Sequence, residues 1–235
     1  MEALLDANNH YLGERGPMIT SFGLLYEPRD IPEPRISRDT PALVAAVSAP
    51  HGDLGNPVPS LPDVVTEGEA VANRFVSSRL LTGQSATLHE IMERISDSGV
   101  FHFAGHASNS YSMPGLLLSD TTLTARSLEK FKVFRTQLVV LSACDTEEGA
   151  LGSVEAADSV VGYFVRAGVP RVVASRWNVD SALTRQFMNV FYTHLVAGLS
   201  VEESISKAQN ALRGQPANAH PFYWAAFTVF GSGTS

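Results

Sequence analysis

The chain has 235 residues, of which 44% are hydrophobic and 17% charged, and its mean hydropathy is +0.03. This composition excludes a disordered chain and provides for one large core or two small ones. The formal net charge of −7 disfavours sequence-neutral nucleic-acid binding, so no direct nucleic-acid partner is expected. The longest apolar runs hold about six residues, whereas a bilayer span needs about 20, so no membrane partner is expected.

The N-terminus and the cysteine content narrow the class further. Residues 1–16 lack the basic and long apolar regions of a signal peptide, which predicts a soluble, cytoplasmic protein. Cys144 is the only cysteine, so an internal disulfide and a cysteine-rich zinc cluster are excluded. A lone cysteine is most often a small buried hydrophobe, and its neighbours in sequence must decide whether it is more.

The first predicted elements lead into a core that begins at Ala42. A short helix is expected at 1–10 and a strand at 17–26, and the proline-rich segment 27–41 reads as irregular. We therefore divide the chain into an N-terminal arm (1–41) and one core domain (42–235). The predicted elements that follow are a strand at 42–48, a loop at 49–62, a helix at 64–77, a strand at 80–82, a helix at 87–95 and a strand at 100–104 ended by Gly105.

The second half of the chain continues the alternation. The predicted elements are a hairpin at 116–118 and 121–124, a helix at 126–131, a strand at 137–143, a helix at 154–167 closed by Gly168, a strand at 171–175, helices at 180–197 and 201–212, and a last strand at 222–230. Short apolar strands between helices predict an α/β three-layer sandwich with a mostly parallel sheet flanked by helices. Functional groups of such sheets collect at the carboxyl ends of the strands.

Two of these strands end on reactive side chains. FHFAGHAS carries His106, and VVLSACDT carries Cys144. If the strands are parallel neighbours, both residues emerge at the same edge of the sheet. A free thiol is only a few per cent ionised at neutral pH, and an adjacent imidazole increases the reactive fraction as an ion-pair partner or a general base. The backbone amides of Ala107 and Cys144 are candidate oxyanion donors.

Four segments in this order resemble the CHAT domain family, a caspase-like group related to separases and caspases. They are FHFAGHAS, LSACDT, VVASRWNVD and HPFYWAAFTVFG, which together span residues 101–231. The resemblance implies a caspase-like fold, with His106 as catalytic histidine and Cys144 as nucleophile. Two departures are Ala107, where the family usually has glycine, and Ser181, where a second aspartate often follows Asp180.

The resemblance also implies a function and a setting. The expected activity is a cysteine endopeptidase (a hydrolase) acting on protein substrates, without metal or organic cofactor. Family members of this kind occur in bacterial signalling or defence systems, often after helical repeats. A helical-repeat region or a regulatory protein is therefore an expected partner.

Four residues are candidates for the substrate pocket: Asp145, Arg176, Trp177 and Asp180. An acidic pocket would favour a basic P1 side chain, whereas an exposed Arg176 would accept an acidic one. Other interpretations are open: Asp180 opens DSALTRQFM as a helix N-cap residue would, and Arg176 and Asp180 could pair with each other. The run at 222–224 is expected to pack in the core.

His102 lies four residues before His106, so the two share a face of a regular strand. The His-Glu-x-x-His pattern of zinc peptidases is absent, and we interpret His102 as a structural or supporting residue. Papain-like enzymes have the opposite order of cysteine and histidine, and no G-x-S-x-G or phosphate-binding loop is present. The alternatives are a catalytically silent caspase-like module that docks a partner protein, and a flavodoxin-like binding protein.

Overall fold

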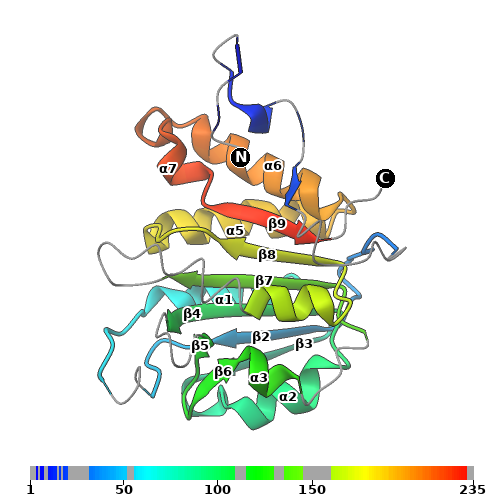
Figure 1. Cartoon of the computed structure of the whole chain (residues 1–235), viewed down its shortest axis with the longest axis vertical. Coiled ribbons are helices and arrows are strands. Elements are labelled where there is room, and N and C mark those ends of the chain that lie inside the picture. Colours follow the sequence, from blue (N-terminus) through cyan, green and yellow to red (C-terminus); the bar gives the residue numbers. More distant parts are fainter. Residues whose placement is uncertain are drawn as a thin grey trace.

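The computed structural model describes residues 4, 6–7, 10–14, 16, 18–20, 32–51, 56–108, 115–129, 135–144 and 160–231. Its sheet follows the order β1 (Ile19–Thr20), β9 (Phe227–Gly231), β8 (Arg171–Ser175), β7 (Leu138–Cys144), β4 (Val100–Ser108), β2 (Ala42–Ala46) and β3 (Ser78–Thr82) (Figure 1). β8 and β9 pair antiparallel, and every other pair along this path is parallel. β5 (Gly115–Leu117) and β6 (Thr122–Thr124) form the predicted hairpin beside the end of β4.

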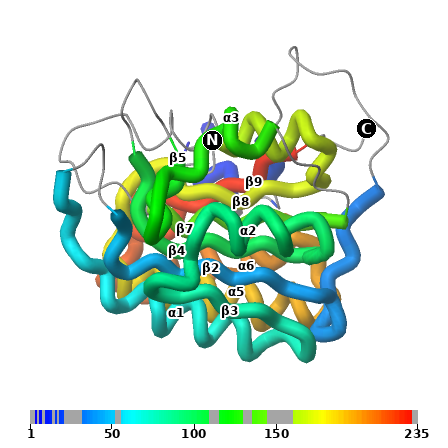
Figure 2. Tube along the Cα trace, turned by 90° about the horizontal axis from the view of Figure 1, so that it is seen from below, coloured from blue at the N-terminus to red at the C-terminus, as the bar shows by residue number. Residues whose placement is uncertain are grey.

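Helices cover both faces of this sheet and complete three layers. On one face lie α1 (Asp63–Ala72), α5 (Ser181–Leu195) and α6 (Val201–Arg213), and on the other α2 (Leu88–Ile95), α3 (Ala125–Leu128) and the helical residues 160–166. Figure 2 shows α3 and β5 on the opposite side of the molecule from α1. The 3-10 turns are η1 (Leu12–Glu14), η3 (Gly83–Ser85) and η4 (Pro216–Asn218). The predicted mostly parallel sandwich is thus confirmed.

Strand β4 is longer than predicted, because Gly105 does not end it. All nine residues of Val100–Ser108 are buried, and the strand passes straight through Gly105. A Cβ atom on Gly105 would lie 2.9 Å from Phe103 Cζ and 3.2 Å from the carbonyl oxygen of Val47. Glycine is therefore needed here for close packing against Phe103 and the Val47 carbonyl and not for a turn, so His106 lies within the strand.

The last predicted strand is wrong in its first half, where Pro221–Trp224 forms the short helix α7. The ring of His220 accepts a hydrogen bond from Phe222 N, and Pro221 occupies the first turn, where its missing N–H costs nothing. Trp224 is buried as expected, but Phe222 and Tyr223 are 46% and 37% exposed. Helix capping outweighs the β propensity of these aromatic residues.

Two further points concern the ends and the helices. β1, from the predicted N-terminal arm, pairs in parallel with β9, and the boundary between residues 41 and 42 stays a prediction. Within the described ranges, no helix combines the length and the apolarity that a bilayer crossing requires.

Candidate active site

The two chemistry-bearing strand ends lie side by side. β4 and β7 pair in parallel over seven positions, and the last pair in this register is His106 with Cys144. Register partners on adjacent strands are separated by about 4.8 Å along the hydrogen-bonding direction. Figure 1 shows β4, β7 and β8 ending at the same edge of the sheet. The expected juxtaposition of the two residues is therefore present in the backbone; the side chain of Cys144 lies outside the described part.

The ring of His106 is buried and held by a backbone carbonyl. Its Nε2 lies 2.7 Å from the oxygen of Pro59, in the loop that leads into α1. A carbonyl only accepts hydrogen bonds, so Nε2 carries a hydrogen, and in the neutral ring Nδ1 carries the lone pair. This assignment leaves Nδ1 as the basic nitrogen of the ring.

The loop that carries Pro59 is itself fixed on the end of β2. Leu61 N donates to the oxygen of Ser48 at 2.9 Å, and the hydroxyls of Ser48 and Ser60 lie 3.1 Å apart. Val47 N in turn donates to Ala104 O of β4 at 2.8 Å. The carbonyl that orients His106 is thus anchored to the same sheet as His106.

The predicted oxyanion donors are two backbone positions at these strand ends. Ala107 lies inside β4, where it is in register with Leu116 of β5, and it is buried. Cys144 is the final residue of β7. The two amides belong to adjacent strands at the carboxyl edge of the sheet.

The four candidate pocket residues separate into different roles. The Asp180 carboxylate caps α5, because its Oδ1 accepts from Ala182 N at 2.9 Å and from Leu183 N at 3.3 Å. The guanidinium of Arg176 reaches the hydroxyls of Thr20 and Thr228, at 3.3 and 3.2 Å. Asp145 lies outside the described residues.

Trp177 follows β8 at the carboxyl edge of the sheet and is partly buried. Its ring stacks on Phe222 at a centroid distance of 6.3 Å and an interplanar angle of 18°. Its Nε1–H donates to the oxygen of Phe222 at 2.9 Å, which fixes the ring against α7. Trp177 is therefore a rigid apolar surface one strand away from Cys144.

The second histidine of β4 lies deeper, between two helices. His102 Nδ1 is 3.0 Å from the hydroxyl of Tyr192 on α5, and Nε2 is 3.2 Å from Glu67 Oε1 on α1. All three side chains are buried. This placement agrees with the predicted supporting role, and the shared side with His106 fits the two-residue period of the strand.

Sequence reasoning missed Pro59, Glu67 and Tyr192. A carbonyl group carries no sequence signal, because every residue has one. Glu67 does carry a signal, since it lies among the buried positions Val64, Gly68 and Val71 on one face of α1. A charged residue within a core-facing stripe indicates a buried partner.

Comparison with known proteins identifies the family of this chain. The CHAT domain model matches residues 1–232. Tetratricopeptide repeat protein 28 of Mus musculus is 26% identical over 288 residues, and that of Homo sapiens is 23% identical over 283 residues. Each match covers 96% of this chain but only 11% of the relative, so the chain spans a small part of these proteins.

Two solved structures share the fold at low sequence identity. Gingipain R of Porphyromonas gingivalis, an Arg-specific cysteine proteinase, has a TM-score of 0.60 and 13% identity, covering 85% of this chain and 49% of that one. The Saccharomyces cerevisiae separase–securin complex has a TM-score of 0.54 and 16% identity, covering 85% of this chain and 12% of that one. This likeness shows the caspase-like α/β fold. The family model covers residues 1–232, and the chain therefore belongs to the CHAT domain family.

Proposed function

We propose that this protein is a cysteine endopeptidase in which His106 and Cys144 form the catalytic dyad. The observation that carries the proposal is the register of β4 and β7, which places the two residues beside each other at the carboxyl edge of the sheet. The Pro59 carbonyl also supports the proposal. It accepts a hydrogen bond from Nε2–H of His106, so in the neutral ring Nδ1 is available as the base.

The reaction follows from these positions. His106 Nδ1 takes the thiol proton of Cys144, and the thiolate attacks the scissile carbonyl carbon. The amides of Ala107 and Cys144 stabilise the oxyanion, and His106 then protonates the leaving amine as the C–N bond breaks. Water, deprotonated by His106, hydrolyses the resulting thioester and regenerates the thiol.

For the substrate pocket we propose Trp177 as a wall, with Asp145 as the acidic candidate. Trp177 lies at the end of β8, next to β7, and its ring is held in place by Phe222. Asp180 is assigned to capping α5 and Arg176 to the hydroxyls of β1 and β9, so neither governs P1 preference in this account. The substrate is a protein or an exposed peptide loop.

The cellular setting is also a proposal. The names of the relatives support a helical-repeat region as the partner of this domain. A cytoplasmic location and a bacterial signalling or defence role rest on the family resemblance, while the two relatives described above are mammalian.

A peptide library varied at P1 tests the activity. Wild type is expected to cleave, whereas Cys144→Ala and His106→Gln are expected to lose cleavage. His89→Gln is the matched control, because His89 is an exposed histidine on α2, on the other face of the sheet. Cleavage that survives Cys144→Ala would overturn the proposal.

If no variant cleaves, a thiol-directed peptide electrophile separates the remaining cases. Labelling of Cys144 in wild type but not in His106→Gln indicates an enzyme that lacks its activator. No labelling in either supports the catalytically silent module that docks a partner.

A further inference from the structure

Three buried polar side chains from three elements meet behind the candidate active site. Glu67 belongs to α1, His102 to β4 and Tyr192 to α5. His102 Nδ1 lies 3.0 Å from Tyr192 Oη, and His102 Nε2 lies 3.2 Å from Glu67 Oε1. Burying such groups is costly unless each is hydrogen-bonded, so the cluster needs a defined arrangement of hydrogens.

Tyr192 decides which nitrogen of His102 carries the hydrogen. Burial, and then the negative charge of Glu67, raise the pKa of Tyr192 well above its usual value of 10.0, so the phenol keeps its hydrogen. That hydrogen needs a buried acceptor, and His102 Nδ1 is within hydrogen-bonding distance. Nδ1 therefore carries the lone pair and Nε2 carries the N–H.

The Nε2–H then faces Glu67. In the described part of the chain, Nε2 of His102 and Oε1 of Glu67 are buried without a hydrogen-bond partner, and the two atoms lie 3.2 Å apart. The contact distance is short enough for a hydrogen bond, although its angle is poor. The strands on either side present only Val44 and Val140 in register with His102.

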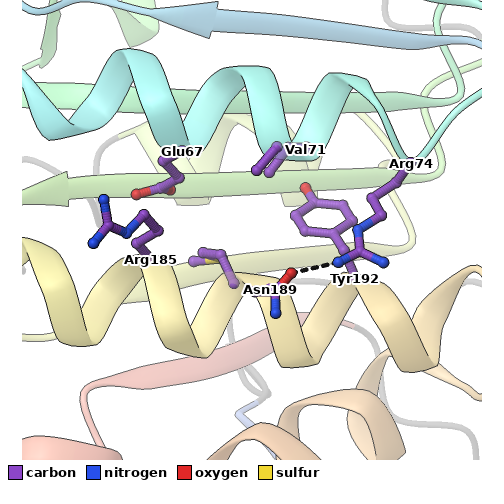
Figure 3. A pocket seen from close by; sticks show the side chains of 8 residues that line it. Glu67, Val71, Arg74, Arg185, Asn189 and Tyr192 are labelled. Carbon is purple, nitrogen blue, oxygen red and sulfur yellow. Dashed lines mark hydrogen bonds between the residues drawn. The ribbon is translucent and has the colours of Figure 1, made fainter.

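Two arginines line a small pocket beside this cluster. This pocket between α1 and α5 has Glu67 and Tyr192 in its lining, with Arg74 and Arg185 as its cations (Figure 3). Arg185 Nη1 lies 3.6 Å from Asp63 Oδ1, and Arg74 donates to the amide oxygen of Asn189.

This cluster is connected to His106 by two routes. His102 and His106 lie on the same face of one buried strand, four residues apart. In addition, α1 begins at Asp63, four residues after Pro59, whose carbonyl holds His106. Glu67 therefore fastens to β4 the helix whose entrance loop orients the candidate base. Gly68 packs α1 directly on β2, since a Cβ there would lie 2.6 Å from Ala46 Cβ.

We propose that Tyr192 and Glu67 hold His102 in its Nε2–H tautomer. This fixed arrangement of the three side chains positions the His106 ring against Pro59. The consequence for catalysis rests on the proposed peptidase function, whereas the effect on His106 itself does not. Glu67, His102 and Tyr192 are thus positioning residues and not catalytic ones.

The test is NMR of the full chain labelled with ¹⁵N-histidine, which carries seven histidines. Spectra of His102→Gln and His106→Gln assign the two rings. In wild type, both rings are expected to carry hydrogen on Nε2. In Glu67→Leu, the Nε2–H of His106 is expected to exchange with solvent about tenfold faster or more. Glu67→Gln, which keeps an acceptor oxygen, should restore the wild-type rate.

Glu202→Leu is the matched control, because Glu202 is a second buried carboxylate, paired with Arg171 in another part of the fold. It breaks a buried pair by the same change and should leave His106 unaffected. An Nδ1–H tautomer of His102 in wild type, or an unchanged His106 in folded Glu67→Leu, would overturn the proposal. If Glu67→Leu does not fold, Tyr192→Phe decides: it removes only one hydroxyl, and an unchanged His106 there has the same meaning.

Peptide cleavage gives the second readout. Glu67→Leu is expected to lower kcat about 10- to 100-fold with little change in KM, and Glu67→Gln to recover most of it. Failure of the peptidase function is recognised separately, because the NMR measurement needs no cleavage. A kcat unaffected by Glu67→Leu would contradict positioning even in an active enzyme.

Discussion

The two histidines of β4 share one face of the sheet and differ in what their ring nitrogens meet. His102, in the middle of the strand, has Tyr192 on one nitrogen and Glu67 on the other. His106, near its end, has a carbonyl on Nε2 and Cys144 as its register partner. A histidine ring with a polar contact at both nitrogens suits a structural role. A ring that is held at only one nitrogen still has a second nitrogen that can accept a proton. The comparison teaches that position along the strand, more than burial, separates the two roles.

The largest expected effect comes from the end of the strand. His106→Gln should reduce kcat/KM by about 10²- to 10⁴-fold, the range of a general base, and change the unfolding free energy little. Peptide cleavage measures the change in kcat/KM, and urea denaturation measures the change in unfolding free energy. If His106→Gln strongly lowered the unfolding free energy but left residual activity, His106 would have the structural role that is assigned to His102.

The middle of the strand should behave in the opposite way. His102→Phe leaves Glu67 and Tyr192 buried without their common partner, which costs about 3–5 kcal/mol of unfolding free energy. Chemical denaturation of His102→Phe and of His106→Gln measures the difference between their unfolding free energies. Equal stability of the two variants would contradict the structural role of His102.

Gly105 lies between the two histidines, and a substitution there tests how closely this part of β4 is packed. Gly105→Ala brings a Cβ to 2.9 Å from Phe103 Cζ and 3.2 Å from the Val47 carbonyl. We expect a loss of about 1–3 kcal/mol by overpacking, seen in thermal or chemical unfolding. A neutral substitution would mean that β2 and β4 adjust without cost.

The pH dependence of stability sharpens the description of the buried cluster. Burial and the charge of Glu67 raise the pKa of Tyr192 in the folded state. Its contribution to the unfolding free energy is therefore complete below about pH 10, the unfolded value, and is lost above it by about 1.4 kcal/mol per pH unit. Tyr192→Phe should make this decline less steep. Burial also raises the pKa of Tyr163, so the part of the decline that comes from Tyr163 remains in the variant. Identical slopes for wild type and Tyr192→Phe between about pH 9 and 11 would argue against a buried phenol.

The smallest effect concerns Asp180, outside both histidine sites. Asp180→Ala removes the N-cap of α5 and should cost about 1 kcal/mol without changing P1 preference. The P1-varied library checks this, and Asp180→Asn, which still caps, is the control. An altered P1 preference in both variants would return Asp180 to the substrate pocket.

Most strands could be predicted because their apolar runs are short and bounded by polar turns. The run 137–143, for example, corresponds to Leu138–Cys144. The errors arose where tertiary packing or capping outweighs local preference, as at Gly105 and at Pro221–Trp224. The helix expected at 64–77 ends at Ala72, so Val76 lies beyond it and is 73% exposed.

The candidate site divides in the same way. The motifs at two strand ends were sufficient to predict that His106 and Cys144 would be neighbours, because parallel strands bring their ends together. The Pro59 carbonyl, 47 positions before His106, could not be predicted from the residue type. Tyr192 reaches His102 across 90 positions, so its role depends on how α5 packs on the sheet.

The most direct test of the dyad uses the single cysteine. Because Cys144 is the only thiol, its rate of alkylation by iodoacetamide reports on this site alone. We predict that wild type reacts faster than His106→Gln at neutral pH, and that the variant follows the profile of a free thiol with a pKa of about 8.5. Identical pH profiles for the two proteins would contradict the claim that His106 activates Cys144.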